Sequence, residues 1–364
     1  MAISRFFGIR SFVLAIAALV AALVLIVGVP LAYAEETGSC GADGDDVKYV
    51  LSDDGKLTIS GEGAIADGAF EGREDVTQVV IEEGVTHIGD GAFAGCESLV
   101  GANLPQGLES IGAEAFVWCT AMEAIDIPAD VASIGEVAFA GCMALKSISL
   151  PESLTTISPY AFAECARLSS VSIPANVTVI GEGAFSECLS LESVNIPAGV
   201  TDIGAYAFAA CISLQSIVIP ASVTSIGEDA FICCPSATIS VDSVNSVYDS
   251  RDGCNALIET ATNTLIAGTA YSSIPDTVTA IGSGAFAEPS RIEEWLQEIG
   301  LEGIAYQRLT GIQIPDSVTS IGSGAFRDCA SLTALAIPAS VTRIGSGAFS
   351  GTTAAIDYAG SQAQ

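Results

Sequence analysis

Positively charged residues are scarce in this sequence of 364 residues. It has 12 lysines and arginines against 43 aspartates and glutamates, which gives a formal net charge of −31. Nucleic acid and anionic membrane surfaces attract basic proteins, so this balance argues against both as partners. The charge favours cationic partners or a solvated acidic surface, and the solvated surface is the simpler interpretation.

Histidine is rarer still, because His87 is the only one in the chain. No serine forms an identifiable triad with it and an acid. No Cys-x-x-Cys pair suggests a zinc site. The sequence therefore predicts a protein that is not an enzyme, with no catalytic residue, no cofactor and no metal site.

The first 34 residues differ in character from the rest. Arg5 and Arg10 precede an apolar run over 12–31, and a small-x-small triplet ends at Ala34. This order is typical of a secretory signal peptide that is cleaved after Ala34. The apolar run is also long enough to span a bilayer, so an uncleaved N-terminal anchor remains an alternative and the only expected membrane contact. Both alternatives predict export, to the medium or to the cell surface.

Phenylalanine recurs with a fixed period of 23 residues over most of the chain. A period between 20 and 29 residues is the mark of a leucine-rich-repeat solenoid, in which stacked coils bury a shared core. The series consists of Phe70, Phe93, Phe116, Phe139, Phe162, Phe185, Phe208 and Phe231, followed after longer gaps by Phe286, Phe326 and Phe349.

Each repeat has the same order of residue types, as the segment 168–188 illustrates. It reads Leu-Ser-Ser-Val-Ser-Ile-Pro-Ala-Asn-Val-Thr-Val-Ile-Gly-Glu-Gly-Ala-Phe-Ser-Glu-Cys. The alternating apolar residues predict a short strand, which the proline ends because it has no N–H for the ladder. Val-Thr-x-Ile predicts a second extended piece. The glycine after it is expected to turn the chain, and Ala-Phe-x-x-Cys to form about one helical turn.

The motif Ile-Pro-x-x-Val-Thr-x-Ile-Gly-x-x-Ala-Phe-x-x-Cys resembles the BspA-like, or treponemal-type, class of leucine-rich repeat. The resemblance extends over residues 66–351 and implies a right-handed coil of short parallel strands. It also implies a secreted or surface protein, since some members of the family bind host matrix proteins or mediate coaggregation.

Both ends of the array have atypical sequences. Residues 35–65 are expected to form an N-terminal cap, because alternating apolar residues on either side of Asp53-Asp54-Gly55 predict a β-hairpin. Residues 352–364 form a C-terminal tail with a Tyr-Ala-Gly-Ser segment that is similar to the end of arrays in this family. We expect a monomer.

The period fails in two places. Residues 236–273 form an irregular coil, in which Asn263-Thr264 is expected to turn a hairpin between 256–260 and 265–267. Residues 288–304 form an insert that contains an amphipathic helix with Ser290 as its N-cap.

The insert has two interpretations. Ile292, Leu296 and Ile299 share one face of the expected helix, and Trp295 lies beside that stripe. The helix can lie on the flank of the solenoid with Trp295 partly buried. Alternatively, the insert binds a partner, because insertions in solenoids map to one face that often binds.

Eight of the eleven cysteines occupy the third place after a repeat phenylalanine. Stacked coils would hold their side chains parallel at the strand spacing of about 4.8 Å, whereas a disulfide needs Cβ atoms about 3.5 to 4.5 Å apart. We therefore expect buried free thiols, with Cys40 and Cys254 as the better candidates for pairing. The eight are Cys96, Cys119, Cys142, Cys165, Cys188, Cys211, Cys234 and Cys329.

Recognition is expected where the repeat fails. The outward positions of the predicted strands are small and polar, and they lack the Tyr, Trp and Arg that anchor protein interfaces. The candidate partner-binding residues are Tyr248, Arg251, Arg291, Trp295 and Tyr306. The leading hypothesis is an exported recognition or adhesion protein that binds a protein or glycan of a host or neighbouring cell. A structural surface spacer without a specific ligand is the alternative.

Overall fold

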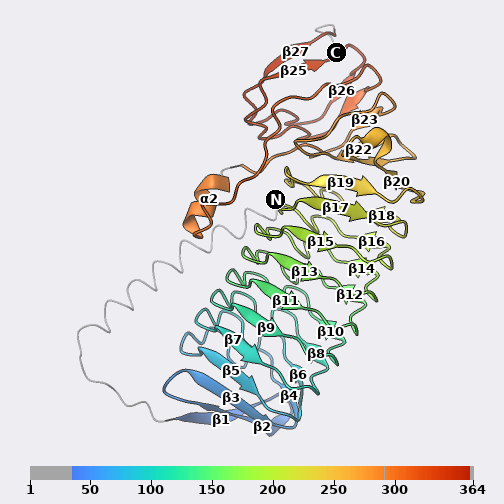
Figure 1. Cartoon of the computed structure of the whole chain (residues 1–364). Coiled ribbons are helices and arrows are strands. Elements are labelled where there is room, and N and C mark those ends of the chain that lie inside the picture. The colour runs from blue at the N-terminus through green and yellow to red at the C-terminus, as the bar shows by residue number, and fades with distance from the viewer. Residues whose placement is uncertain (1–34, 291, 361–364) are drawn as a thin grey trace, which may run out of the picture.

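The computed structural model describes residues 35–290 and 292–360, so the predicted signal segment lies outside it. The described chain forms a stack of coils along one axis, with short strands in rows on its sides (Figure 1). Neighbouring coils pair in parallel and in phase; Ser147, for example, pairs with Ser170 of the next coil. The predicted solenoid is thus confirmed.

The N-terminal cap consists of β1 (Glu36–Gly41), β2 (Gly44–Leu51), β3 (Lys56–Gly61) and β4 (Gly63–Ile65). β2 and β3 form the expected antiparallel hairpin. β1 was not expected, because its glycine-rich sequence has no alternating pattern; it pairs antiparallel with both β2 and β4. β3 and β4 then pair in parallel with the first two strands of the array, so the cap begins both strand rows.

Two rows of strands run along the first part of the stack. The first row contains β5 (Gln78–Ile81), β7 (Gly101–Asn103), β9 (Ala124–Asp126), β11 (Ser147–Ser149), β13 (Ser170–Ser172), β15 (Ser193–Asn195), β17 (Ser216–Ile219) and β19 (Thr238–Val241). The second contains β6 (Val85–Ile88), β8 (Ser110–Ile111), β10 (Ser133–Ile134), β12 (Thr156–Ile157), β14 (Val179–Ile180), β16 (Asp202–Ile203) and β18 (Ser225–Ile226).

The remaining strands form a second part of the stack. β20 (Tyr248–Asp249), β21 (Leu257–Glu259), β22 (Thr264–Ala267), β23 (Ala280–Ile281), β24 (Ser320–Ile321) and β26 (Arg343–Ile344) make one sheet, and β25 (Ala334–Ile337) pairs with β27 (Ala355–Tyr358). The 3₁₀ helix η1 (Arg251–Gly253) precedes β21, and α2 (Ile292–Glu298) projects from the side. β21 and β22 form the expected antiparallel hairpin.

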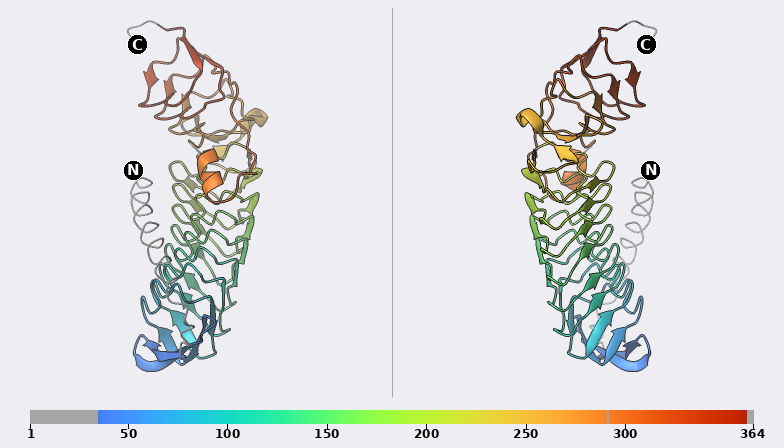
Figure 2. Two further views of the ribbon diagram at one scale, coloured as in Figure 1. Left: turned by 90° about the vertical axis from the view of Figure 1, so that its left-hand side faces the viewer. Right: turned by 90° about the vertical axis from the view of Figure 1, so that its right-hand side faces the viewer.

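The repeat phenylalanines stack on one another at the centre of the core. Adjacent ring centroids are 5.1 to 5.7 Å apart, and the ring planes differ by 1 to 11°. The stack runs from Phe70 to Phe231 and starts again at Phe286. Two large core clusters meet at this junction, and the stack changes direction there (Figure 2).

The cysteines of the repeats do more than fill space. All eleven cysteines are free, and Cys40 and Cys254 lie in different core clusters, so they do not pair with each other. Each ladder thiol lies 3.1 to 3.3 Å from the carbonyl oxygen of the preceding coil's phenylalanine, as Cys188 does to Phe162. The thiol therefore donates a hydrogen bond to a carbonyl beside the aromatic stack.

The repeat glycine acts differently from the expectation that it turns the chain. Gly204 and Gly227 have no positive φ, but a Cβ at either would come within 2.5 Å of backbone in the preceding coil. The glycine is therefore needed for close approach between coils.

The segment around each phenylalanine is a pair of turns and not the expected helical turn. Positive φ occurs two residues before every repeat phenylalanine, and two residues after every one except Phe286, as at Gly91 and Gly95 around Phe93. A left-handed residue interrupts a right-handed helix, so the chain forms four-residue turns, such as the one closed by the hydrogen bond from Cys96 N–H to Phe93 O.

Candidate functional site

Tyr248 of the irregular coil is a core residue. Its side chain is 5% exposed, and its hydroxyl accepts a hydrogen bond from the Ile226 N–H at 2.9 Å. Burial raises the pKa of the hydroxyl. Tyr248, one of the candidate partner-binding residues, is thus buried, because its position in β20 turns its ring into the coil.

Arg251 holds the irregular coil together. Its guanidinium lies against the Asp249 carboxylate, with an Nη2–Oδ2 distance of 2.6 Å, and Nη1 donates to Asn263 Oδ1 at 2.8 Å and Thr277 Oγ1 at 3.3 Å. These bonds connect β20 to the hairpin turn of β21 and β22. Most of its donors are therefore used within the chain.

The insert helix α2 lies on the flank of coils far earlier in the sequence. Ile292 and Leu296 are 3% exposed and pack with Ala166, Leu189 and Ile212. The interpretation of an amphipathic helix on the solenoid flank thus matches these contacts. Trp295 is half-buried in the same cluster, and its ring N–H is buried without a hydrogen-bond partner among the described residues.

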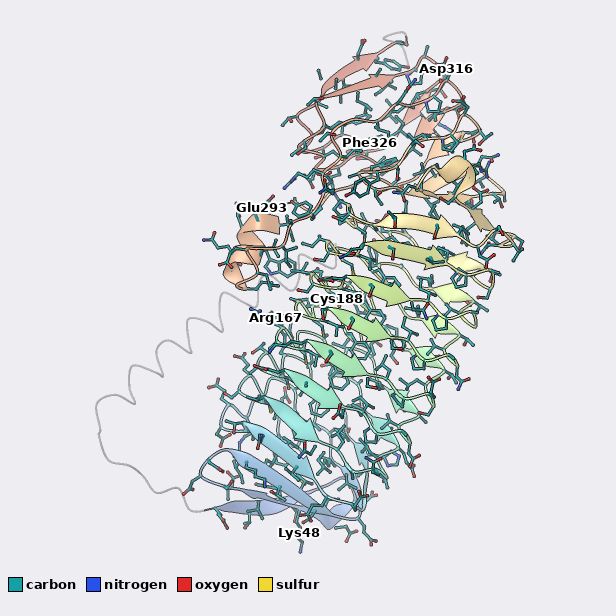
Figure 3. The ribbon with its side chains drawn as sticks, viewed as in Figure 1. Lys48, Arg167, Cys188, Glu293, Asp316 and Phe326 are labelled. Carbon is teal, nitrogen blue, oxygen red and sulfur yellow. The ribbon has the colours of Figure 1, made fainter. Side chains whose placement is uncertain are left out.

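Arg167 contacts the chain directly after the C-terminal end of α2. Nη2 of Arg167 lies 3.3 Å from the carbonyl oxygens of Ile299 and Gly300, just beyond α2 (Figure 3). A cation at a helix C-terminus is favourable because the carbonyls there carry partial negative charge. Arg291, at the near end, lies outside the described residues.

The buried carboxylate of Glu288 joins the two chain segments that lead into and out of the insert, around residues 288 and 306–309, which we call the neck of the insert. Glu288 is 2% exposed; its Oε1 accepts a hydrogen bond from the Leu309 N–H at 2.5 Å, and its Oε2 lies 3.6 Å from Arg308 Nη1. Burial raises the pKa of Glu288, and the Leu309 N–H and Arg308 partly offset this. The carboxylate therefore holds together the segment that leaves the stack of coils and the segment that returns to it.

Tyr306 belongs to the same neck. Its hydroxyl donates to Glu293 Oε1 at 2.9 Å, and the Arg308 guanidinium lies 4.9 Å from the centre of its ring. The structure therefore brings Trp295 and Tyr306 into one cluster on the insert. It does not bring them together with Tyr248 and Arg251, which belong to the irregular coil.

Sequence reasoning missed a second group of aromatic residues, on the flank of the regular coils. Trp118 and Tyr160 are half-buried around an apolar cluster formed by Val117, Ala140 and Ala163. A Cβ at Gly141 would lie 2.4 Å from the Trp118 ring, and one at Gly183 would lie 2.2 Å from the Tyr160 ring. Each ring thus lies over a glycine of the next coil. The available signal was a bulky residue at a repeat position where neighbouring coils carry glycine.

Three further features of the described residues bear on possible sites: the outward serines, a cavity, and the distribution of metal-ligating side chains. The outward serines of the first strand row are exposed, as the sequence indicated. A cavity of about 220 Å³ lies where the phenylalanine stack breaks and includes Asp229, Tyr248, Glu259 and Ser283 in its lining. Within residues 35–290 and 292–360, no three His, Cys, Asp or Glu side chains gather as a metal site, and no helix could cross a bilayer.

Comparisons with known proteins agree with this architecture. The model of the BspA-type leucine-rich-repeat region matches six copies, over residues 63–191, 178–263 and 268–357. A leucine-rich cell surface protein from Faecalibacterium prausnitzii has a solved structure with 27% identity and a TM-score of 0.59, covering 90% of this chain and 97% of its own. A leucine-rich-repeat protein from Eubacterium ventriosum has 25% identity and a TM-score of 0.49, covering 90% and 73%. No curated protein matches the sequence.

Proposed function

Because this chain belongs to the family of BspA-type leucine-rich-repeat proteins, we propose that it is an exported, non-enzymatic recognition protein that binds a protein or glycan at the cell surface. The similar protein from Faecalibacterium prausnitzii is described as a cell surface protein, which supports this location. The predicted signal segment at residues 1–34 supports export.

The observation that carries the proposal is the pair of half-buried aromatic rings on the flank. Tryptophan and tyrosine are the side chains that most often anchor protein interfaces. Trp118 and Tyr160 are held flat over glycines of neighbouring coils, so little side-chain freedom is lost when a partner contacts them. The flank replaces the irregular coil as the favoured recognition surface, because Tyr248 and Arg251 are engaged within the chain.

The mature chain, residues 35–364, can be screened against extracellular matrix proteins, neighbouring-cell surface proteins and glycans. We expect saturable binding to one of them, and the double variant Trp118→Ala/Tyr160→Ala to weaken it at least tenfold. Val50→Ala is the control, because Val50 is an exposed apolar residue of the cap and away from this flank. Binding that is unchanged in the double variant would contradict the placement of recognition on the flank.

A structural spacer is the second candidate, and the continuous phenylalanine stack is the observation that favours it. Rings stacked at 5.1 to 5.6 Å over eight successive coils give a stiff body with constant reach. Absence of saturable binding by the wild-type chain in every screen would support the spacer against the recognition protein.

A further inference from the structure

The flank that carries Trp118 and Tyr160 has charge of a single sign. We define the acidic flank as the residues from four before to two after each phenylalanine in the coils of Phe70 to Phe231. This segment contains acidic residues in seven of the eight coils and no lysine or arginine in any. The acidic residues are Asp67, Glu71, Asp90, Glu114, Glu136, Glu164, Glu182, Glu187, Glu228 and Asp229.

Several basic residues of the described chain pair outside the acidic flank, whereas Arg327 lies near it: burial raises the pKa of Asp229, and the positive charge of Arg327 partly offsets this. Arg73 pairs with the cap, Lys146 with Glu123 beside the first strand row, and Arg251 and Arg308 within the irregular coil and the insert. Within residues 35–290 and 292–360, Glu136 and Glu228 are exposed and form no ion pair with a basic side chain. At Glu136 and Glu228, the acidic flank therefore carries negative charge that no basic side chain of the described residues pairs with.

Aromatic rings and carboxylates are adjacent on this surface. The Tyr160 hydroxyl donates to Glu182 Oε1 of the next coil at 2.5 Å, so an aromatic ring and a carboxylate are in direct contact. A cation close to the face of a Trp or Tyr ring is attracted by its quadrupole, and a nearby carboxylate strengthens the attraction.

We propose that the acidic flank binds an extended, lysine- and arginine-rich segment of a partner protein. Cationic side chains of that segment stack on Trp118 and Tyr160 and pair with Glu136, Glu182 and Glu228. This inference rests on the proposed recognition function and names its partner class. Coils about 4.8 Å apart place these three carboxylates along a line of roughly 19 Å and the whole acidic flank along roughly 34 Å, which about ten extended residues span.

The same chemistry argues against a neutral glycan on this flank. A sugar ring stacked on an aromatic residue also needs hydrogen-bond donors around it, because its hydroxyls both donate and accept. The ionised carboxylates of the acidic flank only accept, and the Tyr160 hydroxyl already donates to Glu182. A cationic peptide supplies the donors that this surface lacks.

The test measures binding of a synthetic twelve-residue peptide of alternating lysine and glycine to the mature chain, residues 35–364. We expect saturable binding that weakens as salt rises. The charge variant Glu136→Gln/Glu182→Gln/Glu228→Gln and the aromatic variant Trp118→Ala/Tyr160→Ala should each weaken it at least tenfold.

The matched control is Asp130→Asn/Glu192→Gln/Asp316→Asn, which removes the same charge from exposed positions outside the acidic flank. We expect it to change binding less than twofold. Equal loss in the control and in the flank variants would show attraction by net charge alone and overturn the inference.

Two further outcomes separate this inference from the proposed function. Saturable binding of a matrix or cell-surface protein without binding of the lysine peptide overturns the inference and leaves the recognition function standing. Binding of a neutral oligosaccharide that depends on Trp118 and Tyr160 but not on the three glutamates also overturns it. Circular dichroism and thermal melting of each variant establish that a loss of binding is not a loss of fold.

Discussion

Non-glycine residues with positive φ carry a local cost in several coils. Glu114 has a φ of 56° at the position where Gly91 has 62° and Gly183 has 58°. A left-handed conformation costs a residue with a Cβ roughly 1–2 kcal/mol compared with glycine. We expect Glu114→Gly to raise the free energy of unfolding by about 1 kcal/mol, measured by urea denaturation.

Ala113→Gly is the control for this prediction. Ala113 directly precedes Glu114 but has no positive φ, so glycine gains nothing there and adds freedom to the unfolded chain. We expect Ala113→Gly to lower the stability. A loss of stability in Glu114→Gly would show that the left-handed backbone is not strained by its side chain.

Thiol reactivity tests the cysteine ladder. Burial raises the pKa of Cys96 from 9.0 to about 11, so its thiolate is about 100-fold rarer at pH 8 than that of an exposed thiol. With a thiol reagent at pH 8, we expect the native protein to react slowly. Cys233 should react first because it is half-buried and the other ten are buried, although burial raises the pKa of its thiol as well.

Unfolding without a reductant provides the control, and all eleven thiols should then react rapidly. Cys233→Ser should remove the fastest phase of the native protein's reaction with the thiol reagent and leave the later phases unchanged. A total of about one reactive thiol per chain after unfolding would show that the cysteines are paired in disulfides.

At the scale of single elements, α2 is held mainly by its apolar face. Leu296→Ala removes a side chain that is 3% exposed, and such truncations cost about 2–5 kcal/mol where the element cannot collapse onto the gap. We expect faster proteolysis within residues 289–308 and a red-shifted Trp295 fluorescence, while the strand rows stay intact. Glu298→Ala, on the exposed face of the same helix, should change neither measurement. Unchanged proteolysis in Leu296→Ala would mean that the contacts of Glu288, Tyr306 and Arg308 at the neck of the insert are enough to hold it.

The contact of β1 with the first coil depends on pH. Hydrogen bonds from Arg73 lower the pKa of Glu36 and of Asp75 below their ordinary values of 4.5 and 3.8. A lowered folded-state pKa contributes stability above the unfolded value, and that contribution is lost as the pH falls through the folded value.

Arg73→Met should therefore destabilise the cap at pH 7 and have little effect near pH 2. The three side chains are between 28% and 58% exposed, so solvent screening keeps the loss below about 1 kcal/mol. Lys146→Met, which removes the more exposed pair with Glu123, should have a smaller effect. Chemical denaturation at both pH values measures this, and an equal loss at pH 7 and pH 2 would contradict it.

At the scale of the whole molecule, the break in the aromatic stack divides the core. Phe139→Ala and Phe326→Ala each remove one stacked ring, at a cost of about 3–5 kcal/mol. Because nearest neighbours carry most of the coupling in a repeat protein, we expect each variant to lose hydrogen-exchange protection mainly in its own stack. The two variants control each other, and equal loss on both sides of the junction would show that the core acts as one unit.

The sequence predicted most of the architecture because the period repeats one local rule. The Phe, Cys, Leu and Pro columns fixed the coil, the core and the strand rows. The cap hairpin and the hairpin at Asn263 followed from ordinary turn chemistry. The cleaved or uncleaved state of residues 1–34 stays a prediction.

What the sequence did not predict depends on contacts between coils. Nothing local shows that Arg167 meets the end of α2, because 132 residues separate Arg167 from Ile299. The role of Gly204 depends on the backbone of the preceding coil, which a single repeat does not contain. Trp118 and Tyr160 were overlooked because a search of the columns that recur through the array passes over residue types that occur in only one or two coils.

The direction of the ladder hydrogen bonds determines how the molecule responds to pulling. These bonds run along the stack, so tension applied to the two chain ends loads them one coil at a time. Each released coil of 23 residues lengthens the chain by roughly 75 Å. The 40 residues from Phe286 to Phe326 would give one longer step of roughly 130 Å. A molecule that stretches in equal steps absorbs a sudden load gradually, as an extensible tether does.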